Sequence, residues 1–217
     1  MPMRAMTLHW IAPRKRVCVC PAYWAIDMQI IPRSSYQRMP WKNGKGLTEE
    51  VIVAPLGSTM ETFDWRLSIA HVGEDGPFSI FPGVDRSIAL LDGEGLRLDL
   101  PNGDSKVLRP YGEPFAFAGE WAISSSNIGG PTIDLNIMTR RGCYQHSMHR
   151  YRSVEPLRIR ADSDTILVFK SAAEIKTREG VISTTPFSSV VLSAGDDITI
   201  TASDILHLLV IELQSNL

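Results

Sequence analysis

The sequence contains no run of about 18 or more apolar residues, so it has no segment that could cross a bilayer as a helix. It also lacks an excess of charge of either sign, since 22 lysines and arginines stand against 24 aspartates and glutamates, with a formal net charge of −2. No global field therefore favours nucleic acid or an anionic membrane as a partner. Any site for an anion has to be built locally.

Cysteine is scarce. The three cysteines are Cys18, Cys20 and Cys143, and the C-x-C pair lacks the second pair of cysteines or histidines that a zinc site needs. We therefore expect reduced thiols, no metal and no other cofactor.

Residues 1–27 differ in character from the rest of the chain. Three basic residues at 14–16 precede an apolar stretch at 17–26, which resembles the start of a signal peptide. Pro21 interrupts that stretch, and residues 22–25 make a poor cleavage signal. We interpret residues 1–27 as an irregular extension before the functional chain, with export as the alternative.

From residue 28 onward, short apolar segments alternate with turn signals, which is typical of strands. The turns include GEDGP at 73–77, PNGD at 101–104 and AGDD at 194–197. A chain of 217 residues with 44% apolar residues can build one large all-β domain or two fused small barrels. Because sheets of many short strands usually close or stack, we predict a barrel or paired barrels.

Two segments alternate between apolar and polar residues with a period of two. In the first, Trp65, Leu67 and Ile69 alternate with Arg66 and Ser68. If the apolar set packs against another layer, the polar set faces the interior of a barrel, and polar interiors of small barrels are typically ligand cavities. The alternative is an ordinary half-exposed sheet whose polar residues face solvent.

The same logic applies to residues 133–138, where it turns Asp134, Asn136 and Met138 toward the interior. A further candidate is the glycine-rich segment WKNGKGLTEE at 41–50. Its glycines would allow positive φ and a close backbone approach to a ligand, although it lacks the order and spacing of a P-loop. The alternative is a decorated turn that leads into a strand.

In order and spacing, several motifs resemble the HutD/Ves family, and the resemblance covers residues 28–142 well. They are WKNG at 41–44 with Thr48 and Glu49, FDWRLSIA at 63–70, DGPFS at 75–79, FPGVDR at 81–86, LDGEG at 91–95, PFAF at 114–117 and DLNIMTR at 134–140. Lys45 departs from the family, which usually has a small residue there. The resemblance implies an all-β, cupin-type double barrel (bicupin) in a bacterial cytoplasmic protein. It also implies an association with histidine utilisation, in a regulatory role, or with stress responses.

This fold divides the chain into the extension at 1–27, a first cupin-like barrel with the ligand site at 28–142, and a second, smaller β half at 143–217. The metal-binding cupin pattern is H-x-H, then three or four residues, Glu, six residues and Gly. We take Gly93 as its final glycine. It places Ile80 and Pro82 at the histidine positions and Arg86 at the glutamate position. A guanidinium repels a divalent metal and binds carboxylates, so we expect this site to bind an anion instead of a metal cation. His146 and His149 would form a pair at helical spacing, but an exposed loop is the ordinary explanation.

The leading hypothesis is a metal-independent protein that binds a small carboxylate metabolite, such as formylglutamate, formiminoglutamate or urocanate. Arg66 or Arg86 would hold the carboxylate, and polar and aromatic groups would orient the rest. The full set of predicted ligand residues is Trp41, Asn43, Thr48, Glu49, Arg66, Ser68, Phe81, Asp85, Arg86, Asp134, Asn136 and Met138.

Two alternatives stay open. The first is a metal-independent enzyme, an isomerase or amidohydrolase-like protein with Asp134 or Glu49 as general base. The second is a structural or interaction barrel. Cupin-like edges often pair two subunits, which leaves room for a homodimer.

Overall fold

The computed structural model describes residues 28–41 and 44–216, so the predicted extension at 1–27 lies outside it. The described residues form antiparallel strands in four sheets and one turn of 3-10 helix, Arg33–Ser35. None of their helices is long and apolar enough to span a membrane. The prediction of an all-β fold is confirmed. Cys143 is disulfide-bonded, which corrects the expectation that the cysteines are reduced thiols.

Two sheets make up what we call the N-terminal lobe. The six-stranded sheet has the order β2-β3-β4-β11-β6-β9, with β2 (Gln37–Pro40), β3 (Gly46–Ala54), β4 (Trp65–Val72), β11 (Thr132–Arg140), β6 (Val84–Asp92) and β9 (Phe115–Ala118). The four-stranded sheet has the order β5-β10-β7-β8, with β5 (Gly76–Pro77), β10 (Ser124–Ile128), β7 (Gly95–Asp99) and β8 (Ser105–Leu108).

Two further sheets make up the C-terminal lobe. The five-stranded sheet has the order β1-β17-β14-β19-β12, with β1 (Gln29–Ile31), β17 (Ser189–Leu192), β14 (Asp164–Phe169), β19 (Leu206–Ser215) and β12 (Tyr144–Ser153). The four-stranded sheet has the order β13-β18-β15-β16, with β13 (Leu157–Arg160), β18 (Asp197–Thr201), β15 (Ala173–Lys176) and β16 (Val181–Thr184).

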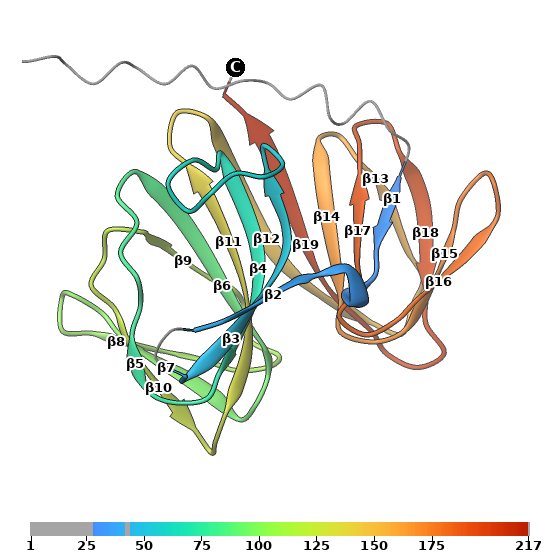
Figure 1. The fold of residues 1–217 in the computed structure, drawn as a ribbon. Helices are drawn as coiled ribbons and strands as arrows, with labels where there is room; N and C mark the ends of the chain where they lie inside the picture. The colour runs from blue at the N-terminus through green and yellow to red at the C-terminus, as the bar shows by residue number, and fades with distance from the viewer. Residues whose placement is uncertain (1–27, 42–43, 217) are drawn as a thin grey trace, which may run out of the picture.

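The four sheets stack as layers, with the six- and five-stranded sheets at the centre (Figure 1). A large apolar cluster joins these two sheets and includes Trp65, Leu67 and Ile69 from β4 and Ile166 and Leu209 from the C-terminal lobe. The alternation in β4 therefore separates two buried faces, as predicted, and no face of it is an ordinary solvent face. Burial of large apolar side chains of this kind stabilises a fold by about 1.5–3 kcal/mol each.

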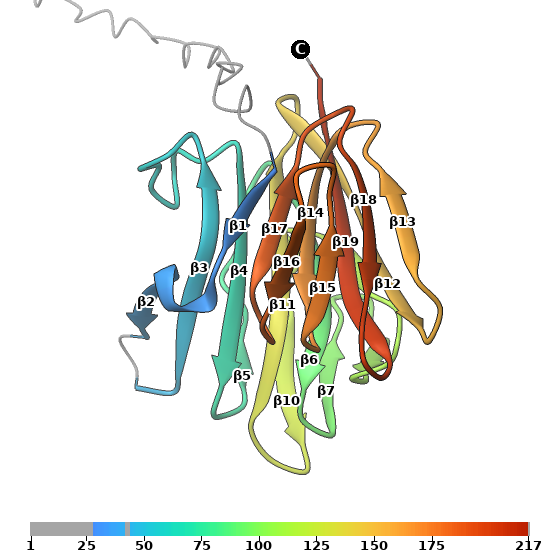
Figure 2. The same ribbon diagram turned by 90° about the vertical axis from the view of Figure 1, so that its right-hand side faces the viewer.

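Each lobe is a sandwich of two sheets and not a single closed barrel, so the fold is best described as a cupin-like β-sandwich in duplicate. One strand crosses between the lobes. β1 precedes the N-terminal lobe in the chain, but residues 29–31 pair with residues 189–191 of β17 in the C-terminal lobe. Figure 2 shows β1 beside β17 in this way. Residues 29–31 thus belong structurally to the second half, whereas β12 starts near the predicted boundary at residue 143.

Candidate functional site

A cavity of about 530 Å³ lies in the N-terminal lobe, on the face of the six-stranded sheet that is turned away from the C-terminal lobe. The predicted ligand residues among its lining are Trp41, Thr48, Arg66, Ser68, Phe81, Arg86, Asp134, Asn136 and Met138. Asn43 lies outside the described residues. Glu49 and Asp85 do not line this cavity. The structure therefore brings most of the predicted set to one place and separates two of its acids from it.

Strand register explains why the cavity face is polar. Met138 of β11 lies opposite Arg66 of β4 on one side and Arg86 of β6 on the other. Two residues along β11, Asn136 lies opposite Ser68. Successive side chains of a strand point to opposite faces, so these rows share one face while their apolar neighbours enter the core between the lobes.

Arg66 has a partner in the fold. Its Nε donates to Oε2 of Glu50 at 2.6 Å, and its Nη1 donates to Oγ of Ser68 at 3.2 Å. Both Arg66 and Glu50 are buried for the most part, with 6% and 16% of their side chains exposed. The charge of Arg66 is therefore balanced within the protein.

Arg86 is buried, and it forms no direct ion pair with an acid of the described residues. Its Nη1 donates to the backbone oxygen of Ser79 at 3.2 Å, and its Nε has no hydrogen-bond partner among the described residues. The guanidinium carbon lies 4.8 to 5.5 Å from the ring centres of Phe78, Phe81 and Phe117. Burial lowers the pKa of Arg86 to about 10, so the group still carries its charge at neutral pH. The rings stabilise the cation only in part, and a donor is left for a ligand.

Asp134 is the acid whose negative charge acts on Arg86. It is 2% exposed, and within the described part of the chain its carboxyl group makes no hydrogen bond or ion pair. Burial raises the pKa of Asp134 to about 7, and the positive charge of Arg86 lowers it only in part. On the same strand, Oδ1 of Asn136 is buried and also without a partner in the described residues. The cavity wall thus holds a cation, a titrating acid and an amide that the fold leaves unsatisfied.

Three residues of the glycine-rich segment, Trp41, Lys45 and Thr48, line the cavity. The indole Nε1 of Trp41 donates to Oγ1 of Thr48 at 2.8 Å, and this hydrogen bond holds the ring against β3. A Cβ on Gly46 would lie 2.5 Å from the backbone oxygen of His71 and 2.8 Å from the Trp41 ring, so only glycine fits there. Lys45, the residue that departs from the family, pairs with Glu74 at 2.7 Å and also lines the cavity.

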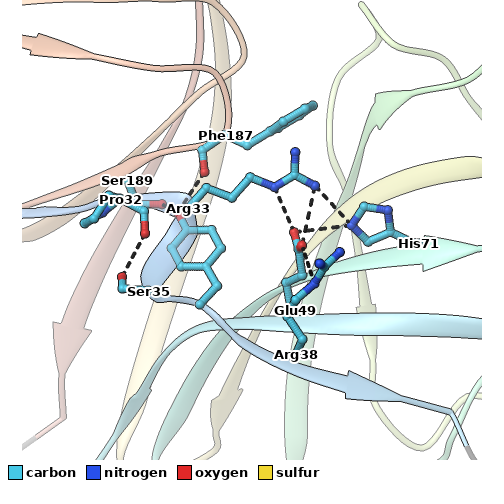
Figure 3. Close-up of polar contacts among 9 residues, drawn as sticks. Pro32, Arg33, Ser35, Arg38, Glu49, His71, Phe187 and Ser189 are labelled. Carbon is cyan, nitrogen blue, oxygen red and sulfur yellow. Dashed lines mark hydrogen bonds and ion pairs between the residues drawn. The ribbon is translucent and has the colours of Figure 1, made fainter.

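Glu49 faces the other side of β3 and forms a separate polar cluster (Figure 3). Its carboxylate contacts Arg33 at 3.1 Å, Arg38 at 3.3 Å and His71 at 3.2 Å. Burial alone would raise the pKa of Glu49, but hydrogen bonds with His71 and Arg33 outweigh it and lower that pKa. The Arg33 guanidinium also lies 4.8 Å from the ring centre of Phe187 in the C-terminal lobe. Glu49 therefore anchors the chain between β1 and β2 to the sheet and is not placed to contact a ligand in the cavity.

Asp85 lies at a second cavity, of about 620 Å³, on the other face of β6. Its Oδ1 accepts a hydrogen bond from Nε of Arg141 at 2.7 Å, and Arg141 also binds Glu120. Asp85 does not pair with the neighbouring Arg86, because adjacent residues of a strand point in opposite directions. Asp85 is instead part of an exposed ion-pair network.

His146 also lines this second cavity, where it links the lobes. Its Nδ1 lies 2.7 Å from Oγ1 of Thr139, and its Nε2 lies 2.9 Å from Oγ of Ser87. Burial lowers the pKa of His146 to about 4, so the ring is neutral at physiological pH. His149 is exposed on the other face of β12. Because the segment is a strand, the expected helical spacing does not bring the two histidines together.

The fold family raises the question of a metal, and the side chains of the cavity do not fit one. Two guanidinium groups, Arg66 and Arg86, occupy the wall, and Arg86 stands at the position aligned with the metal-binding glutamate. Within the described residues, no three histidine, cysteine, aspartate or glutamate side chains are grouped to hold a metal ion. Guanidinium groups repel a divalent cation and suit a carboxylate.

Sequence reasoning missed three residues that shape the site: Glu50, Phe78 and Phe117. Glu50 could have been found, because alternation from Thr48 puts Glu50 on the cavity face and Glu49 on the other. The two phenylalanines come from a loop and from β9, and only the folded chain brings them to Arg86.

The two lobes, each a pair of packed sheets, define a cupin-type protein. A cupin conserved-barrel protein from Leptotrichia buccalis has a similar fold, with a TM-score of 0.53 at 10% identity over 82% of this chain and 96% of that one. The HutD family matches residues 33–211. This chain therefore belongs to the HutD family.

Several relatives support the assignment. A protein of Pseudomonas putida, described as an uncharacterized 21.2 kDa protein in the hutC 3′ region, is 36% identical over 69% of this chain and 77% of its own length. Protein Ves of Citrobacter koseri is 40% identical over 48% of this chain and 56% of its own length. The solved structure of HutD from Pseudomonas fluorescens SBW25 is 32% identical, with a TM-score of 0.70 over 87% of this chain and 98% of that one. A conserved protein of unknown function from Pseudomonas aeruginosa reaches a TM-score of 0.79 at 28% identity, over 88% of this chain and 100% of that one.

Proposed function

We propose that this protein binds a small carboxylate metabolite in the N-terminal cavity without a metal, and that binding serves a regulatory role in histidine utilisation. The observation that carries the proposal is Arg86, a buried cation with an unused Nε donor and no acidic partner among the described residues. An unpaired buried charge costs several kcal/mol, so a ligand anion would relieve an unfavourable feature of the empty site. The relative in the hutC 3′ region suggests the pathway.

The cavity chemistry indicates how the ligand would lie. Its carboxylate would accept hydrogen bonds from the Arg86 guanidinium, whose planar fork suits a bidentate contact. The aromatic rings around Arg86 would exclude water from this pair and strengthen it. Asn136 and Ser68 would orient polar groups farther along the ligand, and Trp41 and Met138 would supply apolar walls.

Calorimetric titration of the purified protein tests the proposal. The ligands are N-formylglutamate, formiminoglutamate, urocanate and formate, the last because HutD of P. fluorescens was solved in a formate condition. We expect Arg86→Met to weaken binding about 30-fold or more, since loss of a buried charged contact costs 2–5 kcal/mol. Arg86→Lys should recover only part of the affinity.

Arg141→Met is the matched control, because Arg141 is an arginine of the same lobe that lies outside this cavity. It should bind like the wild type. Failure of all four acids to bind at millimolar concentration, or equal affinity of the Arg86→Met variant, would contradict the proposal.

A second candidate is a metal-independent enzyme, which the properties of Asp134 favour. A buried carboxyl group with a pKa near 7 suits a general base at neutral pH. NMR of each metabolite with the protein would reveal turnover. The enzyme hypothesis expects Asp134→Asn to abolish turnover while binding persists, and it is excluded if no metabolite of the pathway is converted. Glu49, the other base proposed from sequence, lies away from the cavity.

We also propose that the protein is cytoplasmic, and a homodimer is one assembly open to a cupin-type fold. Cell fractionation checks the first, and light scattering of the purified protein checks the second.

A further inference from the structure

Arg86 and Asp134 line the same cavity and carry opposite charges, but they do not form an ion pair. Arg86 is 8% exposed and Asp134 is 2% exposed, but no hydrogen bond or ion pair joins them. The two groups interact only through space. Asp134 therefore balances the charge of Arg86 without occupying its donors, which remain available to a ligand.

The other charged groups that line the cavity already have partners. On β4, Arg66 is paired with Glu50 of β3 at 2.6 Å. In the glycine-rich segment, Lys45 is paired with Glu74 at 2.7 Å. Asp75 accepts a hydrogen bond from the backbone of Asn127 at 2.8 Å.

Among the described residues that line the cavity, Arg86 and Asp134 are thus left as one positive and one negative charge without direct partners. In the free protein, the negative charge of Asp134 therefore acts on Arg86 without direct contact.

We propose that a carboxylate ligand replaces Asp134 as the counter-ion of Arg86, so that Asp134 takes up a proton from solvent when the ligand binds. This inference rests on the proposed function, since it needs an anion at Arg86. Two carboxylates that share a buried site do not both stay ionised, because their repulsion strongly raises one pKa. The carboxylate in contact with Arg86 keeps its charge. Asp134, whose anion is stabilised by no hydrogen bond from residues 28–41 and 44–216, is the one that becomes neutral.

Proton balance fixes the sign of the pH dependence. Burial holds the pKa of Asp134 at about 7 in the free protein. Above that pH Asp134 is ionised before binding, and each ligand bound then requires one proton. Affinity should fall about tenfold per pH unit above the pKa, and it should be nearly constant below it. The proton moves from buffer to an Asp134 oxygen, and no covalent bond to the ligand forms or breaks.

The experiment is a calorimetric titration of the full-length protein with N-formylglutamate at pH 8, in phosphate and in Tris. The carboxyl groups of this ligand ionise near pH 4, so the ligand exchanges no protons at pH 8. The difference in binding enthalpy between the buffers gives the number of protons taken up. We expect close to one proton per ligand in the wild type, and a tenfold weaker affinity at pH 9 than at pH 8.

Asp134→Asn mimics the neutral acid. It should bind without proton uptake and with the same affinity at pH 7 and pH 9. Asp85→Asn is the control, since Asp85 lies on the other face of β6, and it should retain the uptake of the wild type.

The wild-type titration alone decides the matter if the Asp134→Asn variant does not fold. Binding without proton uptake and with a flat pH profile overturns the inference but leaves the proposed function standing. Absence of binding at every pH overturns both.

Discussion

The two lobes share an architecture but fill it differently. In the C-terminal lobe, the space between the sheets holds an apolar cluster that includes Leu167, Phe169, Ile175, Ile200 and Leu208. In the N-terminal lobe, apolar clusters occupy separate regions. Ile88, Leu90, Leu96 and Leu98 belong to one, Val53 and Phe63 belong to another, and a polar cavity lies along the same sheet. Among the described residues, the large buried side chains between the sheets of the C-terminal lobe are mainly apolar, and the buried polar ones there are threonines, serines and His207.

The polar cavity therefore opposes stability instead of providing it. Burial lowers the pKa of Arg86 and raises that of Asp134, and both shifts mean that the folded state disfavours the charged form. Unpaired buried charges of this kind are typical of functional sites, where a ligand supplies the missing partner. Substitutions in each lobe test this difference in how the two lobes contribute to stability.

The largest expected effect is in the filled lobe. Phe169 is fully buried, and Phe169→Ala should lower the free energy of unfolding by about 3–5 kcal/mol, because it removes contacts and leaves a void. Phe81→Ala is the matched substitution in the other lobe. Phe81 borders an existing cavity and is only partly buried, so the loss should be about 1–2 kcal/mol. Urea denaturation measures both, and equal losses would contradict the contrast.

The next effect has the opposite sign. Asp134→Asn should raise the free energy of unfolding of the ligand-free protein at pH 8 by about 2–3 kcal/mol, because an amide has no charge to bury. The folded pKa of about 7 lies above the ordinary value of 3.8, so the ionised group destabilises the fold increasingly as pH rises between those values. The gain should vanish near pH 4. Thermal melts at both pH values check it, with Asp85→Asn, an exposed acid, as a control that should shift little.

Much of this site could be predicted from sequence because strands alternate. The pattern around Trp65 and that around Leu135 placed Arg66, Ser68 and Asn136 on the cavity face. The same rule, applied to adjacent residues, would have separated Glu49 from Thr48 and Asp85 from Arg86. Those two acids belong to the predicted set through shared motifs, and a motif carries no information about which face of a strand a residue occupies.

Other features need the folded chain. The pairing of β1 with β17 joins residues about 160 positions apart, and neither strand carries a local signal for it. The rings around Arg86 come from separate strands and loops, so no spacing in the sequence predicts them.

The stability contributed by His146, whose ring joins the two lobes, should depend on pH. Burial holds the pKa of His146 at about 4, below the ordinary 6.5, so the unfolded chain binds a proton in this range and the folded protein does not. Stability is therefore fully present above pH 6.5 and is lost as pH falls toward 4, by about 1–2 kcal/mol from this residue. His146→Gln should flatten the dependence of the melting temperature on pH. His149→Gln, at an exposed position of the same strand, should leave it unchanged, and a flat wild-type profile would contradict the prediction.

The smallest effect concerns the ion pair between Lys45 and Glu74, two residues that line the cavity. Lys45 and Glu74 are 44% and 62% exposed, and an exposed ion pair contributes little to stability, so Lys45→Gln should leave the free energy of unfolding nearly unchanged. Lys45 is also a partly exposed cation of the cavity lining, so it would attract an anion that approaches the cavity. The variant should therefore bind N-formylglutamate more slowly at low salt, by about threefold or less, and like the wild type at high salt, because salt screens the attraction. Stopped-flow association rates at two salt concentrations separate this steering role from a contact within the complex, which would instead raise the dissociation rate at both.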